Sequence, residues 1–422
     1  MGQSDCPLVP KGVNMQINRI TSPEITQIEI DHMNLSRKLA GECMVLLEND
    51  GTLPLAKGAK IALFGNGARN TVKGGTGSGD VNTRTNVNIE QGLKEAGFEI
   101  TTGAWIDRYD AAIKAAKAAH AAMIEENVKK NGSSYIMESF LNPFVEPAVI
   151  PVTEEDVRNA GCDTAIYVIS RNSGEGADRW AKEGDYYLST EDKEALGVLV
   201  KGFDKVVVIL NIGGVMDMAE LKGMDGINAV LLMTQLGNIG GLALADVLTG
   251  DVTPSGKLTD TWAAKYEDYP SSGTFSHNNG DVHDDDYCEG IYVGYRYFDT
   301  KGIAPVYPFG YGRSYTEFSV VPGKVCIEGQ KVNVSAEVKN IGSVFSGKEV
   351  VQVYVSAPKG SLDKPVKELK AFAKSGLLAP GASECVCAQF DLTDMASYSE
   401  EKAAWILEAG EYVVLVGNSS AD

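Results

Sequence analysis

The sequence predicts an α/β domain with a mostly parallel sheet, followed by an all-β sandwich. Short β-branched runs in the first half of the chain are separated by enough residues for crossover helices, which is typical of a parallel sheet covered on both faces. After residue 317, apolar and polar residues instead alternate with a period of two. We therefore expect a polar tail at 1–30, the α/β domain at 31–250, a connector at 251–317 and the sandwich at 318–422.

The first predicted element is an amphipathic helix over residues 31–48, which Asn49-Asp50-Gly51 would end. Its apolar residues at helical spacing are Leu35, Leu39, Cys43 and Leu46. An apolar run at 61–64 is then followed by a glycine-rich loop and a helical pattern around 89–96. This order indicates a buried strand that leads into a helix.

The same strand pattern returns at 164–169, 205–210 and 229–233. Between the first two predicted strands lies an Ala- and Lys-rich helical stretch, Tyr109 to Lys130, and then a segment that contains prolines. We interpret residues 105–151 as an excursion from the sheet, to which the sequence assigns no function.

The connector and the sandwich follow. Residues 251–315 are rich in Pro, Gly, Asp and aromatic residues, which indicates a long ordered connector wrapped over a neighbouring domain. We assign its residues Glu289, Arg296 and Asp299 to packing between domains. The clearest strand-like runs beyond it are 332–338, 351–355 and 412–416. Short strands separated by turns favour an immunoglobulin-like or fibronectin-like sandwich.

The 422 residues carry 38 basic and 57 acidic side chains, a net charge of −19. No nucleic-acid partner is expected, because phosphate binding needs clustered Lys and Arg. No stretch approaches about 18 uninterrupted apolar residues and no signal-peptide core is present, so we expect no membrane association and a cytoplasmic location. Seven scattered cysteines fit neither a disulfide framework nor a zinc module and favour a reducing compartment.

A glycine-rich loop, Gly74 to Asp80, follows the first buried strand. Its backbone N–H groups could face an anion or a sugar hydroxyl, and a tight turn explains the glycines equally well. No Lys-Ser or Lys-Thr pair follows, and Asn70 stands where the dinucleotide-binding pattern that begins at Gly65 requires glycine. Both departures disfavour nucleotide binding.

The segment from Ser170 to Arg179 lies just beyond the predicted strand that ends at Ile169. In an open parallel sheet, ligands bind at the carboxyl ends of the strands. Glu175 stands there between two glycines, which leave its carboxylate free to reach a substrate. From these residues alone, Glu175 is either a functional carboxylate or an ordinary loop acid.

Other candidate sites are weaker. Asp281 to Asp286 offers hard oxygen donors and one imidazole, but the spacing matches no calcium loop and favours a solvated acidic turn. The four histidines are dispersed and no Ser-His-Asp set stands out. We therefore expect no metal site, no cofactor and no catalytic triad.

Several segments together resemble the non-barrel portion of glycoside hydrolase family 3, which includes many β-glucosidases and β-xylosidases. They occur in the family's order from about residue 33 to the C-terminus. The segments are 37–42 with 45–55, 74–80, 173–176 with 178–179, 240–241 with 245–248, 254–258 with 261–262, 289–299 and 307–316. Blocks in this number and order make the resemblance specific.

The resemblance implies a retaining β-glucosidase that acts on a β-glucoside or an oligosaccharide, with two carboxylates flanking the glycosidic bond. Glu175 falls on the family's general acid/base position. The residues that we expect around the substrate are Gly75, Ser78, Asp80, Asp178 and Arg179. The family's nucleophilic aspartate belongs to a (β/α)₈ barrel.

A barrel needs about 250 residues, and the two predicted domains with their connector leave no room for one. Some family members place the barrel after the fibronectin-like domain, so the chain resembles the N-terminal part of such a reversed-order enzyme. We expect it to be inactive alone, to need the barrel as its partner, and to be compatible with a homo-oligomer. A non-catalytic carbohydrate-binding or scaffold subunit and a β-xylosidase component are the alternatives.

Overall fold

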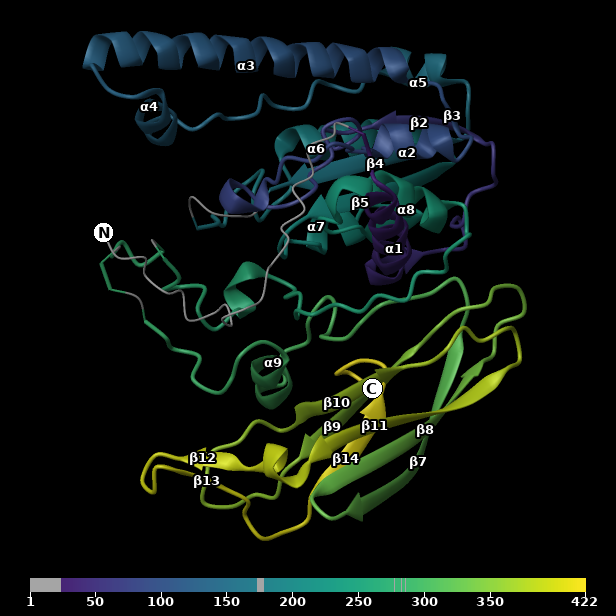
Figure 1. Cartoon of the computed structure of the whole chain (residues 1–422), viewed down its shortest axis with the longest axis vertical. Helices are drawn as coiled ribbons and strands as arrows, with labels where there is room; N and C mark the ends of the chain where they lie inside the picture. Colours follow the sequence, from purple (N-terminus) through teal and green to yellow (C-terminus); the bar gives the residue numbers. More distant parts are fainter. Residues whose placement is uncertain (1–23, 173–177, 277, 282, 285) are drawn as a thin grey trace, which may run out of the picture.

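The computed structural model describes residues 24–172, 178–276, 278–281, 283–284 and 286–422. An α/β domain and a β-sandwich lie one above the other, joined by a long connector (Figure 1). Most of the predicted tail lies outside the described residues. Within them, no helix has the length and apolar character needed to cross a membrane, and all six cysteines are free.

The α/β domain is built on a six-stranded sheet in the order β1-β6-β5-β4-β2-β3. Its strands are β1 (Val45–Asn49), β2 (Lys60–Phe64), β3 (Glu99–Ile100), β4 (Thr164–Arg171), β5 (Lys205–Ile212) and β6 (Ala229–Leu232). Every neighbouring pair is parallel except β1 and β6. The four runs predicted as strands form β2, β4, β5 and β6, and their continuous apolar sequences fit a sheet that is covered on both faces.

The prediction of a helix over residues 31–48 is wrong at its C-terminal end. Helix α1 (Gln27–Cys43) stops earlier, and residues 45–47 are fully buried in β1, paired with β6. Three consecutive apolar residues can all be buried in a strand with two covered faces, which outweighs the helical spacing. The predicted apolar positions Leu35 and Leu39 are 55% and 52% exposed.

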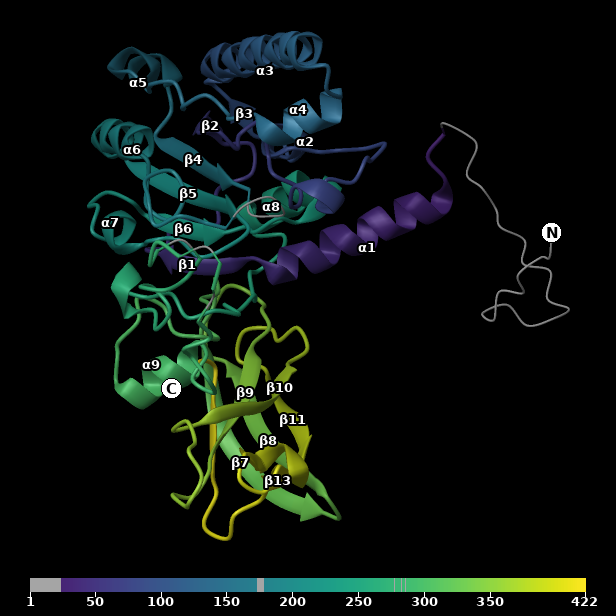
Figure 2. The same ribbon diagram turned by 90° about the vertical axis from the view of Figure 1, so that its left-hand side faces the viewer.

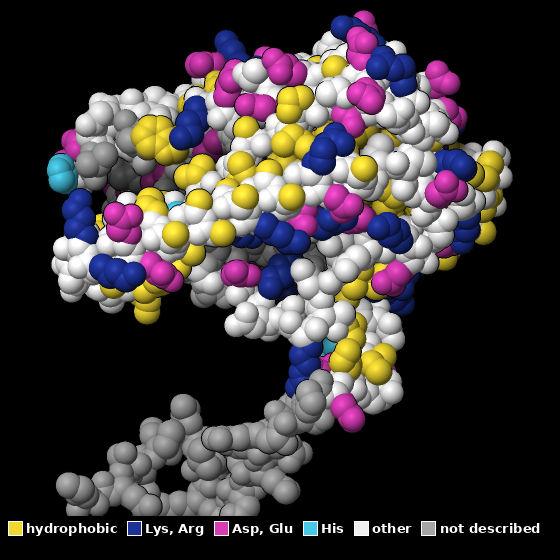
Figure 3. Space-filling view, turned by 90° about the horizontal axis from the view of Figure 1, so that it is seen from above, with side chains coloured by type: hydrophobic (Ala, Val, Ile, Leu, Met, Phe, Trp, Pro, Cys, Tyr) yellow, Lys and Arg dark blue, Asp and Glu magenta, His cyan; other side chains and the backbone are white. Residues whose placement is uncertain are grey.

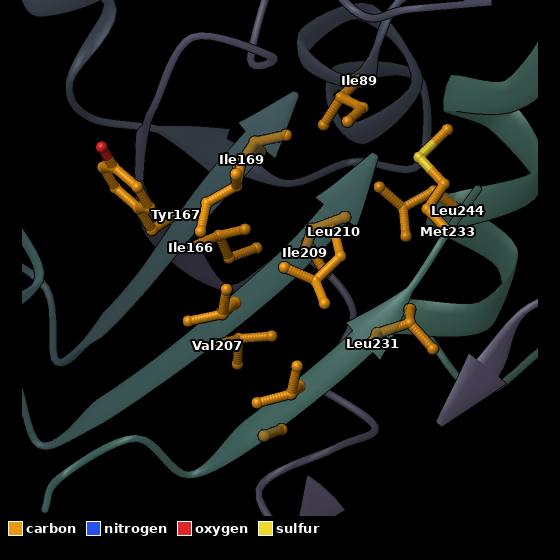
Figure 4. Close-up of a cluster of buried hydrophobic side chains, with 14 of the residues drawn as sticks. Ile89, Ile166, Tyr167, Ile169, Val207, Ile209, Leu210, Leu231, Met233 and Leu244 are labelled. Carbon is orange, nitrogen blue, oxygen red and sulfur yellow. The ribbon is translucent and has the colours of Figure 1, made fainter. Parts of the chain in front are cut away.

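Two layers of helices cover the sheet (Figure 2). Helices α1, α2 (Ile89–Glu95) and α8 (Gly240–Leu248) pack on one face, and α5 (Glu154–Ala160) and α6 (Thr190–Gly202) on the other. The short α7 (Ala219–Lys222) follows β5. Figure 4 shows Ile89 of α2 and Leu244 of α8 beside the buried side chains of β4, β5 and β6.

The excursion from the sheet consists of α3 (Gly103–Asn131) and α4 (Tyr135–Leu141). Trp105 anchors the start of α3, since its ring meets Phe64 of β2 edge-on with 5.4 Å between centroids. The face that carries α3 mixes hydrophobic with charged side chains (Figure 3). At and after α4, the α4 patch consists of Ile136, Phe140, Leu141 and Val145, which are 80%, 82%, 68% and 80% exposed. The excursion therefore leaves an apolar surface uncovered.

The sandwich pairs two antiparallel three-stranded sheets, β10-β9-β14 and β11-β8-β7. The strands are β7 (Phe318–Glu328), β8 (Lys331–Asn340), β9 (Val350–Ser356), β10 (Glu368–Lys374), β11 (Ser383–Asp391) and β14 (Val413–Gly417), with the small pair β12 (Ser397–Ser399) and β13 (Ala404–Ile406) beside them. Val332, Val353 and Phe390 pack together between the sheets. The alternation predicted from the sequence is therefore explained by one buried face per sheet.

The connector contacts both domains. Its short helices are η3 (Tyr266–Asp268) and α9 (Tyr295–Lys301). The Tyr307 hydroxyl donates a hydrogen bond to Glu48 of β1 (2.9 Å), and the Tyr295 hydroxyl accepts one from the Leu369 backbone N–H in β10 (2.7 Å). The remaining 3₁₀ turns are η1 (Gly77–Gly79), η2 (Gly237–Ile239) and η4 (Leu392–Met395).

Candidate functional site

The candidate site lies at the carboxyl edge of the parallel strands. Residues 65–88 follow β2 and residues 172–189 follow β4, and these two strands are parallel neighbours, so both loops leave the sheet at the same edge. The segment 173–177, with Glu175, lies outside the described residues. The geometry of the site is therefore that of the residues around this segment.

A buried asparagine at the end of β5 ties the loops together. The Asn211 side chain is fully buried and donates hydrogen bonds to the carbonyl oxygens of Val72 (2.9 Å) and Thr234 (2.7 Å). Its own oxygen accepts hydrogen bonds from the Val72 backbone N–H (2.7 Å) and from the Ser170 hydroxyl. Because a buried polar group without partners is costly, this set of contacts fixes the start of the glycine-rich loop against the ends of β4 and β5.

The Gly65-Asn66-Gly67 turn belongs to the same framework. Asn66 and Ser170 exchange two hydrogen bonds, from the Ser170 N–H to Asn66 Oδ1 (2.7 Å) and from Asn66 Nδ2 to the Ser170 carbonyl oxygen (2.8 Å). Gly65 has φ of +94°, and a methyl group there would lie 2.2 Å from the Val168 carbonyl oxygen. These glycines allow β2 and β4 to approach each other, which accounts for them without a nucleotide.

The glycine-rich loop curls back on Lys73. The Lys73 ammonium donates a hydrogen bond to the Val81 carbonyl oxygen (2.5 Å) and lies 3.3 Å from the carboxylate of Asp80, whose side chain is 71% exposed. The Lys73 carbonyl oxygen accepts a hydrogen bond from the Gly237 N–H (2.9 Å). Gly75 is half-buried in this loop, and the side chain of Ser78 lies outside the described part.

Both ends of the segment that contains Glu175 are fixed to one residue, Asp185. Arg171 and Arg179 each donate a hydrogen bond to the Asp185 carbonyl oxygen, the second at 2.9 Å. Arg179 also donates to the Asp185 carboxylate (2.8 Å) and to the Val215 carbonyl oxygen (2.5 Å). Asp178 is exposed beside it. Of the expected substrate contacts, Arg179 is thus occupied within the chain, while Asp80 and Asp178 face solvent.

The first of these two ends rests on a buried ionic group. Arg171 lies 3.5 Å from the carboxylate of Asp192, which also accepts a hydrogen bond from the Tyr167 hydroxyl (2.9 Å). Burial lowers the pKa of Arg171 and raises the pKa of Tyr167. Tyr167 therefore stays protonated as a donor, and the stem of the loop is held from below.

Sequence reasoning missed Asn66, Asn211 and Asp185. Asn211 does carry a signal, since it interrupts the otherwise apolar run of β5 at the edge where ligands bind. Its partners stand 139 and 23 residues away in the chain, so their identity emerges only from the fold.

The acidic turn at 281–286 forms local contacts. The Asp281 carboxylate accepts hydrogen bonds from the backbone N–H groups of His283 (2.9 Å) and Asp284 (3.4 Å). Residues 282 and 285 lie outside the description, and among the described residues no group of three or more His, Cys, Asp or Glu could hold a metal ion.

Comparisons with known proteins agree with this architecture. Residues 44–315 match the model of the glycosyl hydrolase family 3 C-terminal domain, and residues 349–420 match that of a fibronectin type III-like domain. Beta-glucosidase A of Butyrivibrio fibrisolvens is 39% identical over 99% of this chain and 52% of its own length. A beta-glucosidase of Ruminococcus albus is 36% identical over 92% of this chain and 39% of its own length.

Solved structures show the same likeness. Beta-glucosidase 3B from Thermotoga neapolitana, in complex with α-D-glucose, superposes with a TM-score of 0.78 at 37% identity, over 94% of this chain and 53% of that one. A beta-glucosidase from Paenibacillus barengoltzii gives 0.77 at 37% identity, over 92% and 42%. The chain thus spans about half the length of the relatives it matches.

Proposed function

The chain belongs to glycosyl hydrolase family 3, and we propose that it is the part of a retaining β-glucosidase that carries the general acid/base, Glu175. In this role the carboxyl group protonates the oxygen of the leaving group and later activates the water that completes hydrolysis. One observation carries the proposal: the segment with Glu175 begins and ends at Asp185, on the sheet edge where ligands of parallel sheets bind.

The attacking carboxylate belongs to a second domain in this proposal. Cleavage needs a nucleophile on the other side of the glycosidic bond, which we assign to a (β/α)₈ barrel that follows in a reversed-order protein. An acid of this kind works best when burial keeps it protonated, and a domain closing over the loop would supply that burial. The isolated chain would accordingly have no turnover.

The neighbouring loops shape the entrance. We propose that Gly75, Ser78 and Asp80 on one loop and Asp178 on the other line the side of the leaving group. The three hydrogen bonds of Arg179 within the chain favour a positioning role for this side chain over direct contact with sugar.

The α4 patch supports a partner domain. Soluble monomers rarely leave clustered apolar side chains as exposed as Ile136, Phe140 and Val145 are here. Figure 1 places α4 on the same side of the domain as the loops that follow β2 and β4. A barrel that covers the carboxyl edge would also cover this patch. A cytoplasmic location belongs to the same proposal, and the free thiols of the six described cysteines are compatible with it.

Reconstitution tests the proposal. Hydrolysis of p-nitrophenyl and methyl β-D-glucosides is measured with this chain alone and with a barrel domain taken from a family 3 β-glucosidase. We expect activity from the mixture only. Substantial activity of the chain alone would contradict the divided site, and faster cleavage of β-D-xylosides would assign a β-xylosidase.

The variant Glu175→Gln identifies the acid. General acid catalysis typically contributes about 10²- to 10⁴-fold, so cleavage of the methyl glucoside should fall by that factor. Cleavage of the p-nitrophenyl glucoside should fall less, because its leaving group departs with little need of a proton. The matched control Glu155→Gln changes an exposed glutamate of α5. A non-catalytic scaffold predicts equal rates for both variants.

A further inference from the structure

A pocket of about 210 Å³ lies between the loop after β4 and the beginning of the connector. Its wall is largely aromatic, and the rings that form it are Trp180, Tyr186, Tyr266, Tyr269 and Phe275. Tyr186 stands edge-on to both connector tyrosines, with centroid distances of 5.1 Å to Tyr266 and 6.4 Å to Tyr269. We call this feature the aromatic pocket.

The wall of the aromatic pocket is preformed. The Tyr269 hydroxyl accepts a hydrogen bond from the Ala263 N–H (3.1 Å) and donates one to the Thr261 carbonyl oxygen (3.3 Å). The Tyr266 hydroxyl accepts a hydrogen bond from Asn278 (2.9 Å). Rings fixed in this way need little further ordering when a ligand enters.

The chemistry of the wall selects an aromatic ligand over a sugar. A pyranose brings several hydroxyl groups, and a hydroxyl buried without a partner is costly. Two polar side chains of the lining are already engaged: Arg179 binds Asp185 and the Val215 carbonyl oxygen, and Ser271 donates to Glu289 (3.1 Å). An aromatic ring has no hydroxyls to satisfy and gains edge-to-face contacts with the tyrosines.

The size of the pocket fits one such ring. An apolar cavity of about 150 Å³ accommodates benzene, so about 210 Å³ leaves room for a phenyl ring with a small substituent. Resting on the function proposed above, we propose that the aromatic pocket receives the aromatic ring of the leaving group of aryl β-glucosides. Arg179 and Trp180, which line it, belong to the loop that would protonate the glycosidic oxygen.

Ligand binding to the whole chain tests the proposal. Phenyl β-D-glucoside and methyl β-D-glucoside are each titrated against the chain and followed by saturation-transfer NMR. We expect the phenyl protons to receive more saturation than the sugar protons, and the methyl glucoside to respond weakly. Equal responses from the two glucosides, or a stronger response from cellobiose, would overturn the aromatic assignment.

Variants locate the binding site. Phe275→Ala should weaken phenyl glucoside binding about three- to ten-fold, the range expected for one lost aromatic contact. Phe372→Ala removes an exposed phenylalanine on β10 of the sandwich and should leave binding unchanged. Circular dichroism verifies that both variants fold. An unaltered Kd for Phe275→Ala would place the ring elsewhere and reject the proposal.

The two proposals fail separately. In a reconstituted enzyme, Phe275→Ala should raise KM for the phenyl glucoside and leave KM for the methyl glucoside unchanged. If phenyl binding depends on Phe275 but Glu175→Gln costs no activity, the pocket stands and the acid/base assignment falls. If Glu175 is needed but Phe275→Ala changes neither Kd nor KM, the pocket falls and the acid/base assignment stands.

Discussion

Two buried asparagines, one in each domain, solve the same structural problem with different consequences. Asn211 ends β5 and Asn340 ends β8, and both side chains are fully buried. Asn340 donates hydrogen bonds to the carbonyl oxygens of Phe345 and Leu378, both at 2.9 Å, and accepts one from the Thr316 hydroxyl at 2.6 Å. Like Asn211, it joins segments that are distant in sequence.

The difference lies in what the joined segments carry. Asn211 stands at the carboxyl edge of a parallel sheet, where neighbouring strands deliver their loops to one place. Asn340 stands at a corner of an antiparallel sandwich, where consecutive strands end at opposite edges. The same local chemistry therefore positions candidate site loops in one domain and closes the fold in the other.

Replacing each asparagine is the strongest way to break this comparison. Asn211→Ala and Asn340→Ala each leave several buried groups without partners, so each should lower the free energy of unfolding by about 2–5 kcal/mol. Only Asn211→Ala should also lower the kcat of a reconstituted enzyme, by about ten-fold or more, measured below the unfolding transition. An equal loss of kcat in Asn340→Ala would show that the two positions do not differ in function.

Glycines at positive φ provide a second, smaller contrast. Gly65→Ala combines the strain of the left-handed conformation with a methyl group 2.2 Å from the Val168 carbonyl oxygen, so a loss of about 2–4 kcal/mol is expected. Gly381 in the sandwich has φ of +79° with nothing within 4 Å of an added methyl group, and Gly381→Ala should cost only about 1–2 kcal/mol. Urea denaturation of both variants measures the difference, and equal losses would remove the role of close approach between β2 and β4.

The smallest expected effect concerns an ion pair of the sandwich. Hydrogen bonds from Lys364 and Ser361 hold the pKa of Glu408 at about 2, below its ordinary value of 4.5. A carboxylate with a depressed pKa stabilises the folded state above pH 4.5, and this stabilisation disappears as the pH falls toward 2. Glu408→Gln should therefore lower Tm slightly at pH 7, with a difference from the parent that shrinks below pH 4.5. A difference that persists at pH 2, or a change in glucosidase activity, would contradict this account.

Much of the fold could be predicted from the sequence. The α/β domain, the sandwich and the family resemblance are confirmed, because continuous apolar runs, period-two alternation and ordered motifs are local properties of the chain. The end of α1 was mispredicted, since the burial of residues 45–47 depends on pairing with β6, far along the chain.

The candidate site was less accessible to sequence reasoning. The position of the Glu175 segment after β4 follows from the order of the strands, whereas the role of Glu175 stays a prediction. The anchors Asn211 and Asp185 act through contacts that no local pattern encodes. The aromatic pocket likewise joins Trp180 and Tyr186 to connector residues about eighty positions later, so only the folded chain brings its wall together.

The shared attachment of Arg171 and Arg179 to Asp185 has an evolutionary consequence. A loop whose two ends meet at one fixed point can grow or shrink at little cost, since doubling its length adds only about 0.6 kcal/mol of closure entropy. Insertions between these arginines would leave the sheet untouched while changing what surrounds the departing group. Related proteins could thus diversify their preference for aglycones by exchanging a few residues, without redesigning the scaffold.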